Sequence, residues 1–519
     1  MSVSTINTIH IDTPDTTVGL SELRLAYLGP TSITLGSSSK KAIEKSQQVV
    51  EQVVRDERVV YGINTGFGQL AQTVVPADRL LDLQKNLIHS HSAGVGEPLD
   101  DAVVRLTLVL KLASLARGCS GVRMVIVDAL SRLLEREIYP LIPSKGSVGA
   151  SGDLAPLAHL AGVLIGEGHV RIQDEVVSAG EGLRVAELTP LELGPKEGLA
   201  LLNGTQVSTA LALGGLFEAE DLLLAAVVAG AMAVEASKSS HIPFDERIHA
   251  ARGQRGQAII AAAFRRFLTG SEINESQEKS ERVQDPYSVR CQPQVLGACL
   301  DLMRSSAEML EIEANAATDN PLIFSESGDI LSGGNFHAEP VGMAADVIAL
   351  SIAEIGSLSE RRIAFMVDSK MSGLPPFLTE HSGVNSGFMI GHVTAAALAS
   401  ENKSLAHPAS IDSLPTSANQ EDHVSMATFA GRRLLTMADN TAGILGVELL
   451  AAAQGLEFLH PLISSKPVMR VLREIRSEVS SYGDDHALSD DIAIMKRSIR
   501  SGCYRKHIKE CGIPSAPRS

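Results

Sequence analysis

Residues 146–159 of this 519-residue chain read Gly-Ser-Val-Gly-Ala-Ser-Gly-Asp-Leu-Ala-Pro-Leu-Ala-His, the most informative stretch in the sequence. Its first three glycines follow the spacing G-x-x-G-x-x-G. This spacing matches neither the dinucleotide-binding glycine pattern nor the phosphate-binding loop, which needs Gly-Lys followed by Ser or Thr. Taken alone, the stretch is typical of a plain turn.

A second interpretation follows from the chemistry of Ala150, Ser151 and Gly152. If the backbone nitrogen of Gly152 attacks the carbonyl carbon of Ala150, a five-membered ring closes. Loss of one water from the ring and one from the Ser151 side chain leaves a conjugated exocyclic alkene. Alanine and glycine are small enough to permit so tight a bend, and glycine tolerates unusual dihedral angles. The triplet therefore has the parts of an electrophile, although its sequence alone does not distinguish a ring from a turn.

The whole stretch resembles the signature of the aromatic amino acid ammonia-lyases, the family of the phenylalanine and histidine enzymes. These enzymes carry 4-methylidene-imidazol-5-one (MIO), formed autocatalytically from an Ala-Ser-Gly triplet without an external cofactor. Further blocks match the family in its own order, at residues 61–68, 202–206, 284–291, 333–337 and 419–423. The likeness runs from about residue 20 to at least residue 480, so chance does not explain it.

The pattern of apolar residues predicts a mainly α fold. Ala344, Ile348, Ile352 and Ile355 form one helical stripe, and similar patterns run through residues 295–317, 388–404 and 424–454. We expect an N-terminal region carrying the MIO loop (1–215), a long central helical bundle (216–480) and a C-terminal helical tail (481–519). The resemblance implies a fumarase/aspartase-like arrangement of that bundle.

The first region mixes shorter elements. Val59–Tyr61 predicts a brief extended segment, and residues 170–177 alternate like a small hairpin. Val122, Ile126, Leu130 and Leu133 mark one face of a helix.

Composition excludes several classes of protein. A net charge of −16 argues against nucleic acid as a partner. The longest apolar run, Leu222–Val234, is too short to cross a bilayer, so no membrane is expected. Five cysteines in so long a chain give no disulfide framework, which favours the cytoplasm.

Two further patterns concern subunits and metals. Ala225–Ala233 is apolar around its whole circumference, so either a thick bundle or other subunits must cover it, and we favour an oligomer. Cys503, His507 and Cys511 align at a spacing of four, but a closed zinc site needs a fourth ligand. We therefore predict no metal site.

The resemblance assigns roles to residues beside Ala150, Ser151 and Gly152. Tyr61 is the candidate base, whose ordinary pKa of about 10 must be lowered for it to act near neutral pH. Arg290 would hold the substrate carboxylate through its planar fork of donors. Asn203 and Gln284 would bind the substrate or activate the MIO carbonyl. Tyr287 and Phe336 would shape the pocket around the MIO ring, and Tyr287 is also expected to be catalytic.

Each of these residues has a structural alternative. Tyr61 could anchor a loop, Arg290 could form a surface ion pair, and the amides and aromatic rings could serve ordinary hydrogen bonding and packing. Asp153 is interpreted as structural from the start, because its carboxylate can accept backbone N–H bonds and so orient the loop.

Two positions favour histidine as the substrate within the family. His91 follows Ser90, where the phenylalanine and tyrosine enzymes typically carry His-Leu or Phe-Leu, and Glu421 stands where those enzymes usually carry Gln. A carboxylate suits an imidazole that donates N–H or bears charge, and it suits a phenyl ring poorly. The resemblance thus implies elimination of ammonia from L-histidine to give trans-urocanate, by a homotetramer whose active sites draw residues from three subunits. A phenylalanine or tyrosine lyase, an aminomutase and an inactive scaffold are the alternatives.

Overall fold

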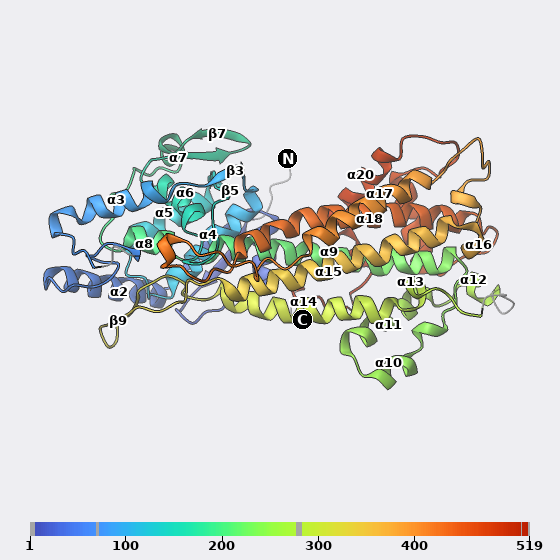
Figure 1. Cartoon of the computed structure of the whole chain (residues 1–519), viewed down its shortest axis with the longest axis horizontal. Coiled ribbons are helices and arrows are strands. Elements are labelled where there is room, and N and C mark those ends of the chain that lie inside the picture. Colours follow the sequence, from blue (N-terminus) through green and yellow to red (C-terminus); the bar gives the residue numbers. More distant parts are fainter. Residues whose placement is uncertain (1–5, 69–71, 277–282, 510, 517–519) are drawn as a thin grey trace.

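The computed structural model describes residues 6–68, 72–276, 283–509 and 511–516. The molecule is mainly helical, as predicted, and it is elongated. An N-terminal region with short strands forms one end, and a bundle of long helices extends from it to the other end (Figure 1). The helices of the N-terminal region are α1 (Leu20–Leu28), α2 (Ser37–Arg55), α3 (Leu80–His91), α4 (Asp101–Ala116), α5 (Met124–Glu135), α6 (Leu154–Leu164), α7 (Ala179–Val185) and α8 (Glu197–Leu202).

Short strands connect these helices. Strands β1 (Asn7–Ile11) and β2 (Thr31–Leu35) pair in parallel, and β3 (Val95–Pro98) pairs antiparallel with β5 (Pro143–Lys145). The predicted hairpin near residues 170–177 is present as β6 (His169–Ile172) and β7 (Glu175–Ser178), extended by β4 (Tyr139–Pro140). A last hairpin consists of β8 (Leu322–Phe324) and β9 (Asp329–Leu331).

Five long helices form the bundle: α9 (Gln206–Ala236), α14 (Gln292–Ala314), α15 (Glu339–Val367), α17 (Met389–Leu405) and α18 (Ala427–Glu457). Shorter helices pack at its far end and sides: α10 (Glu246–Arg252), α11 (Arg255–Leu268), α12 (Glu272–Glu275), α13 (Tyr287–Arg290), α16 (Ser369–Ser372), α19 (Lys466–Glu478) and α20 (Leu488–Arg500). The predicted stripe on α15 is buried at all four positions. Its burial is the reason for the periodicity, because one face of α15 packs against the other bundle helices.

Helix α9 is the centre of the bundle, and all of its 31 residues are buried. A helix without a polar face must be covered on every side, and here the other helices of the same chain cover it (Figure 1). The thick bundle therefore accounts for the apolar run Ala225–Ala233, which by itself requires no second subunit. The boundary expected after residue 215 falls within this continuous helix.

The prediction of an extended segment at Val59–Tyr61 was wrong. No strand forms there, and Tyr61–Ile63 make a turn. The Asn64 side chain accepts a hydrogen bond from the Val60 N–H (2.9 Å) and donates one to the Arg58 carbonyl (2.8 Å). Asparagine offers the backbone these local partners in place of a sheet ladder.

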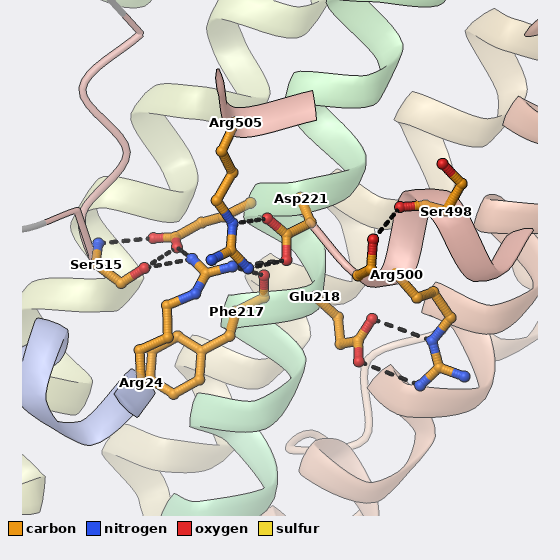
Figure 2. Close-up of polar contacts among 10 residues, drawn as sticks. Arg24, Phe217, Glu218, Asp221, Ser498, Arg500, Arg505 and Ser515 are labelled. Atoms are coloured by element: carbon orange, nitrogen blue, oxygen red, sulfur yellow. Dashed lines mark hydrogen bonds and ion pairs between the residues drawn. The ribbon is translucent and has the colours of Figure 1, made fainter. Parts of the chain in front are cut away.

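Buried charges attach the C-terminal segment to α9 (Figure 2). Arg24 of α1 pairs with Glu220 at 2.5 Å and with Asp221 at 2.6 Å. Arg505, beyond α20, also pairs with Asp221 at 2.5 Å, and the Ser515 N–H donates to Glu220 at 3.0 Å. The tail is therefore held against the middle of the bundle through two carboxylates on one turn of α9.

Two helices, α15 and α18, are long and apolar enough to cross a bilayer by length and composition. Within their most apolar windows, however, 67% and 83% of the residues are buried inside the molecule. Packing in the bundle therefore accounts for their apolar character.

Candidate active site

The loop that carries Ala150, Ser151 and Gly152 lies between β5 and α6, directly beside the start of α9. Gly152 forms a parallel bridge with Gly204, and the Asp153 N–H donates to the Gly204 carbonyl at 2.8 Å. Gly152 has a φ of +74°, and a Cβ there would lie 2.2 Å from that carbonyl oxygen. This approach of two backbone segments therefore requires glycine at position 152.

Asp153 fixes the loop from behind. Its carboxylate is fully buried and accepts hydrogen bonds from the Ser208 N–H (2.7 Å), the Ser208 hydroxyl (2.9 Å), the Thr428 hydroxyl (2.7 Å) and the Ser147 hydroxyl (3.1 Å). Burial raises the pKa of this carboxyl, and the hydrogen bonds offset part of that effect. Asp153 thus connects the loop to α9 and α18, using hydroxyl groups as well as the backbone N–H that we expected.

A cavity of about 1290 Å³ opens in front of the loop. Seven of the eleven predicted site residues line it: Tyr61, His91, Ala150, Ser151, Asn203, Phe336 and Glu421. They come from six separate segments of the chain, and Gly152 follows Ser151 directly. The fold therefore brings together residues that are far apart in the sequence.

Asn203 contacts the triplet directly. It caps the C-terminal end of α8, its side chain is buried, and its Nδ2 donates to the Ser151 carbonyl oxygen at 2.7 Å. Its Oδ1 is also buried and has no hydrogen-bond partner among the described residues. The Asn203 amide is thus held on the loop through its side-chain nitrogen.

Glu421 lies on the opposite side of Ser151. One carboxylate oxygen accepts from the Ser151 hydroxyl at 2.5 Å, and the other accepts from Thr416 (2.5 Å) and Ser417 (3.0 Å). Burial raises the pKa of Glu421, but these hydrogen bonds and the nearby charge of His91 more than offset it and hold the pKa below its usual range. The side chain is therefore a carboxylate at neutral pH.

His91 is the last residue of α3. Its Nδ1 lies 2.9 Å from the Leu87 carbonyl oxygen and 3.0 Å from the Ser90 hydroxyl oxygen, and the carbonyl, which can only accept, favours the proton on Nδ1. In the neutral ring, Nε2 is then the unprotonated nitrogen. Leu83 and Leu87 line the same cavity. The spacing of four from residue 83 to 87 to 91 places all three on one helix face, a signal that could have identified the two leucines from the sequence.

Tyr61 and Phe336 form part of the aromatic wall. The Tyr61 ring packs edge-on against Phe67, with the ring centroids 6.4 Å apart. Phe336 lies in the turn that precedes α15, and it is partly buried. Both rings therefore border the space in front of Ser151.

Gln284, Tyr287 and Arg290 lie elsewhere. They belong to α13 and the segment before it, at the end of the bundle far from α6 (Figure 1). Tyr287 is 71% exposed, and the Arg290 guanidinium stacks 4.6 Å from the centroid of its ring. They line separate surface hollows and not the cavity in front of the loop. One chain thus holds two separate parts of the predicted site.

A family model described as aromatic amino acid lyase matches residues 19–477. The chain belongs to this family. The lyase is 58% identical over 499 residues to a protein of Aliivibrio fischeri strain MJ11 named histidine ammonia-lyase, covering 96% of this chain and 98% of that protein. It is 56% identical over 508 residues to a Vibrio cholerae protein of the same name, covering 98% and 99%.

Solved structures agree with the assignment. The histidine ammonia-lyase of Trypanosoma cruzi superposes with a TM-score of 0.90 at 37% identity, covering 98% of the lyase and 99% of that chain. A tyrosine aminomutase of Streptomyces globisporus superposes equally well at 33% identity, covering 96% and 98%. The lyase is therefore an enzyme that breaks a carbon–nitrogen bond and releases ammonia.

Two of the three residues considered above as zinc ligands, His507 and Cys503, have other partners. His507 Nε2 lies 2.8 Å from Glu474, and the Cys503 sulfur lies 3.1 Å from the Ser498 hydroxyl. Across the described ranges of the lyase, no group of three or more His, Cys, Asp or Glu side chains has metal-binding geometry.

Proposed function

We propose that this lyase eliminates ammonia from L-histidine and releases trans-urocanate, the first step of histidine degradation. The observation that carries the proposal is the pair formed by ionised Glu421 and His91 beside Ser151. A carboxylate next to the reacting position is a favourable partner for an imidazole N–H, whereas a phenyl ring would leave it desolvated and unpaired. The names of the relatives that are 56–58% identical support the same substrate.

The triplet fits the MIO group of the family. Gly152 has a positive φ, which permits a tight bend, and its close contact with Gly204 leaves room for no larger residue. Asn203 Nδ2 already donates to the Ser151 oxygen that would become the ring carbonyl. Once formed, the MIO supplies an electrophilic methylidene carbon that makes loss of ammonia feasible. Dehydration removes the Ser151 hydroxyl, and with it one hydrogen-bond donor of Glu421.

The roles of the chain's own groups follow from their positions and chemistry. Tyr61 removes the β-proton, the C–H electron pair forms the Cα–Cβ double bond, and the C–N bond of the substrate ammonium group breaks with its electron pair leaving on nitrogen as ammonia. The protonated imidazole ring of the substrate carries an N–H on each nitrogen, and it donates one to the unprotonated Nε2 of His91 and the other to Glu421. Asn203 holds the ring carbonyl, and Phe336 limits the space around it.

The remaining residues come from neighbouring copies in this proposal. Gln284, Tyr287 and Arg290 lie at the far end of the same chain, and Tyr287 is exposed. A carboxylate-binding arginine must lie beside the substrate, so the loop end of one subunit meets the α13 end of another. A homotetramer with shared sites satisfies this condition with closed symmetry. Five free cysteines support the cytoplasm as its compartment.

The test is an ultraviolet assay for urocanate with L-histidine, run beside L-phenylalanine and L-tyrosine. Urocanate from histidine alone, lost in Ser151→Ala, supports the substrate and the electrophile together. Intact mass adds an independent measurement, because MIO formation removes two waters from the encoded chain. Cinnamate or coumarate in place of urocanate, a β-amino acid product, or an unmodified mass in the active protein would overturn the proposal.

A further inference from the structure

A buried lysine lies behind the electrophile loop. Lys111 of α4 is 1% exposed, and its Nζ donates to the carbonyl oxygens of Ala200 (3.2 Å) and Asn203 (3.0 Å). These carbonyls belong to the C-terminal end of α8, where helix geometry leaves the last carbonyls without partners. A cation there both satisfies the carbonyls and interacts favourably with the helix dipole.

The same contact leads directly to the triplet. Asn203 accepts from Lys111 through its backbone oxygen, and it donates through its side chain to the Ser151 oxygen at 2.7 Å. The next residue, Gly204, forms the bridge with Gly152. The position of the Asn203 amide therefore depends on a backbone segment that Lys111 holds.

The charge of Lys111 needs an explanation, because burying an ammonium group is costly and a leucine or methionine would fill the space without that cost. Asp319 and Asp153 face Lys111 with opposite charge, and Lys196 faces it with like charge. The Asp319 carboxylate is itself bonded to Lys196 at 2.8 Å. In the described parts of the chain, both hydrogen bonds of Lys111 go to backbone carbonyls. The Lys111 ammonium group thus contacts the backbone segment that carries Asn203.

We propose that Lys111 is a positioning residue for the elimination reaction. It fixes the end of α8 so that the Asn203 amide stays on the Ser151 carbonyl oxygen, and its positive field favours negative charge developing on that oxygen. This role rests on the proposed function, since the oxygen in question becomes the ring carbonyl of the electrophile.

The test compares Lys111→Met with Lys196→Met. Lys196 is a matched control, because it is equally buried but donates to Ser120 and Asp319 and not to Asn203. Intact mass gives the fraction of chains with the electrophile, and kcat is expressed per modified chain. We expect kcat of Lys111→Met to fall about 10- to 100-fold, the effect of losing a hydrogen bond to a charged group, with KM little changed. Lys196→Met should keep its kcat per modified chain.

A spectrum provides a readout independent of turnover. The near-ultraviolet difference spectrum against Ser151→Ala reports on the ring, and its maximum should shift in Lys111→Met and stay in place in Lys196→Met. Unchanged kcat and spectrum in Lys111→Met would overturn the role, as would equal losses in both variants. If the wild type forms the ring but does not turn over histidine, the spectral comparison still tests Lys111 while the proposed substrate fails.

A pH series with Lys111→Gln covers the case in which the methionine variant does not fold. Burial lowers the pKa of Lys111 to about 8, with Asp319 and Asp153 opposing the shift and Lys196 adding to it. Lys111 is therefore mostly charged well below pH 8 and loses its charge as the pH rises through about 8. The ratio of wild-type kcat to Lys111→Gln kcat should be largest below pH 8 and decrease above it, because titration of other groups cancels in the ratio. A ratio independent of pH would contradict a role for the charge.

Discussion

At the scale of single residues, the proposed ring formation would change the hydrogen-bond partners of Glu421. In the encoded chain its carboxylate accepts three hydroxyl donors, one of them from Ser151. The proposed ring formation would remove that hydroxyl, while Thr416 and Ser417 would still hold the other oxygen. The carboxylate then has an acceptor oxygen already oriented toward the cavity, so binding a donor there requires little reorganisation.

Replacing Glu421 with glutamine should impair histidine specifically. The amide keeps the size of the side chain but loses the charge, so kcat/KM for L-histidine should fall about 10- to 150-fold, as expected for a hydrogen bond to a charged group. The inhibition constant of L-phenylalanine as a competitor should not rise in parallel, because a phenyl ring makes no such bond. Steady-state kinetics with L-histidine, without and with L-phenylalanine as the competitor, measure this difference, and equal losses for both would contradict it.

The residues around the triplet differ in whether the sequence alone can identify them. The triplet, Tyr61, His91, Asn203, Phe336 and Glu421 could be selected because each stands in a short motif. Lys111 could not, since its partners are 89 and 92 positions away and no motif marks it. Periodicity and local motifs carry information about neighbours within a few residues, whereas such contacts are set by how helices pack.

At the scale of elements, the close contact between the loop and the start of α9 determines what position 152 tolerates. Gly152→Ala would place a methyl group 2.2 Å from the Gly204 oxygen at a φ of +74°. We expect the two segments to separate, the chain to keep its unmodified mass, and activity to be lost. Intact mass and the urocanate assay check this. Gly333→Ala is the control, since a Cβ there meets nothing within 4 Å; normal ring formation in Gly152→Ala would refute the argument.

The ion pairs in Figure 2 predict two different effects on stability. Arg24→Met leaves Glu220 and Asp221 buried without that partner, which should lower the free energy of unfolding by about 3–5 kcal/mol. Arg500→Met removes ion pairs to Glu218 and Asp439, but the arginine is 40% exposed and water can reach the site, so the loss should be smaller than for Arg24→Met. Denaturant unfolding at one fixed protein concentration measures both. A similar decrease in the free energy of unfolding in the two variants would mean that burial does not determine how much these ion pairs contribute to stability.

The bundle helices were the most predictable elements. The patterns at residues 295–317, 388–404 and 424–454 correspond to α14, α17 and α18, because one buried face repeats over many turns. Val59–Tyr61 was mispredicted, because two valines before a tyrosine favour a strand while the Asn64 side chain, outside that window, holds a turn. The sequence of helix α9 has no periodic pattern that would show which side faces its neighbours, because a helix buried on all sides has no distinct apolar face.

At the scale of the whole molecule, the two parts of the site lie at opposite ends of one elongated chain (Figure 1). The proposed shared site makes a direct prediction for mixtures of inactive variants. Ser151→Ala and Arg290→Met should each be inactive alone, because every site in either homo-oligomer lacks one part. Co-expressed, they should regain measurable activity, since some sites combine an intact loop from one variant with an intact Arg290 from the other.

The urocanate assay on the co-purified, differently tagged pair measures this recovery. Ser151→Ala co-expressed with Tyr61→Phe is the matched control, because both changes affect the loop end of the chain, and it should stay inactive if Tyr61 and Ser151 serve the same site from one subunit. No recovery with Arg290→Met in a verified hybrid would place Arg290 in the same subunit as the loop it serves. The division of the site could not be predicted from helix patterns, because it depends on the length of the bundle and not on any single helix.

The attachment of the loop to α18 also bears on biosynthesis. Thr428 bonds to Asp153 across 275 positions of sequence, and Ser425 donates to the Gly149 carbonyl across 276. A ribosome adding 5–20 residues per second needs roughly 14–55 s to cover that separation. Throughout that interval the start of α9 can already hold the loop through Gly204 and Ser208, but the bonds from α18 are missing, so a ring closure that needs both would be a late event. If the proposed ring forms in this way, the mass of the mature chain would record that folding had reached α18.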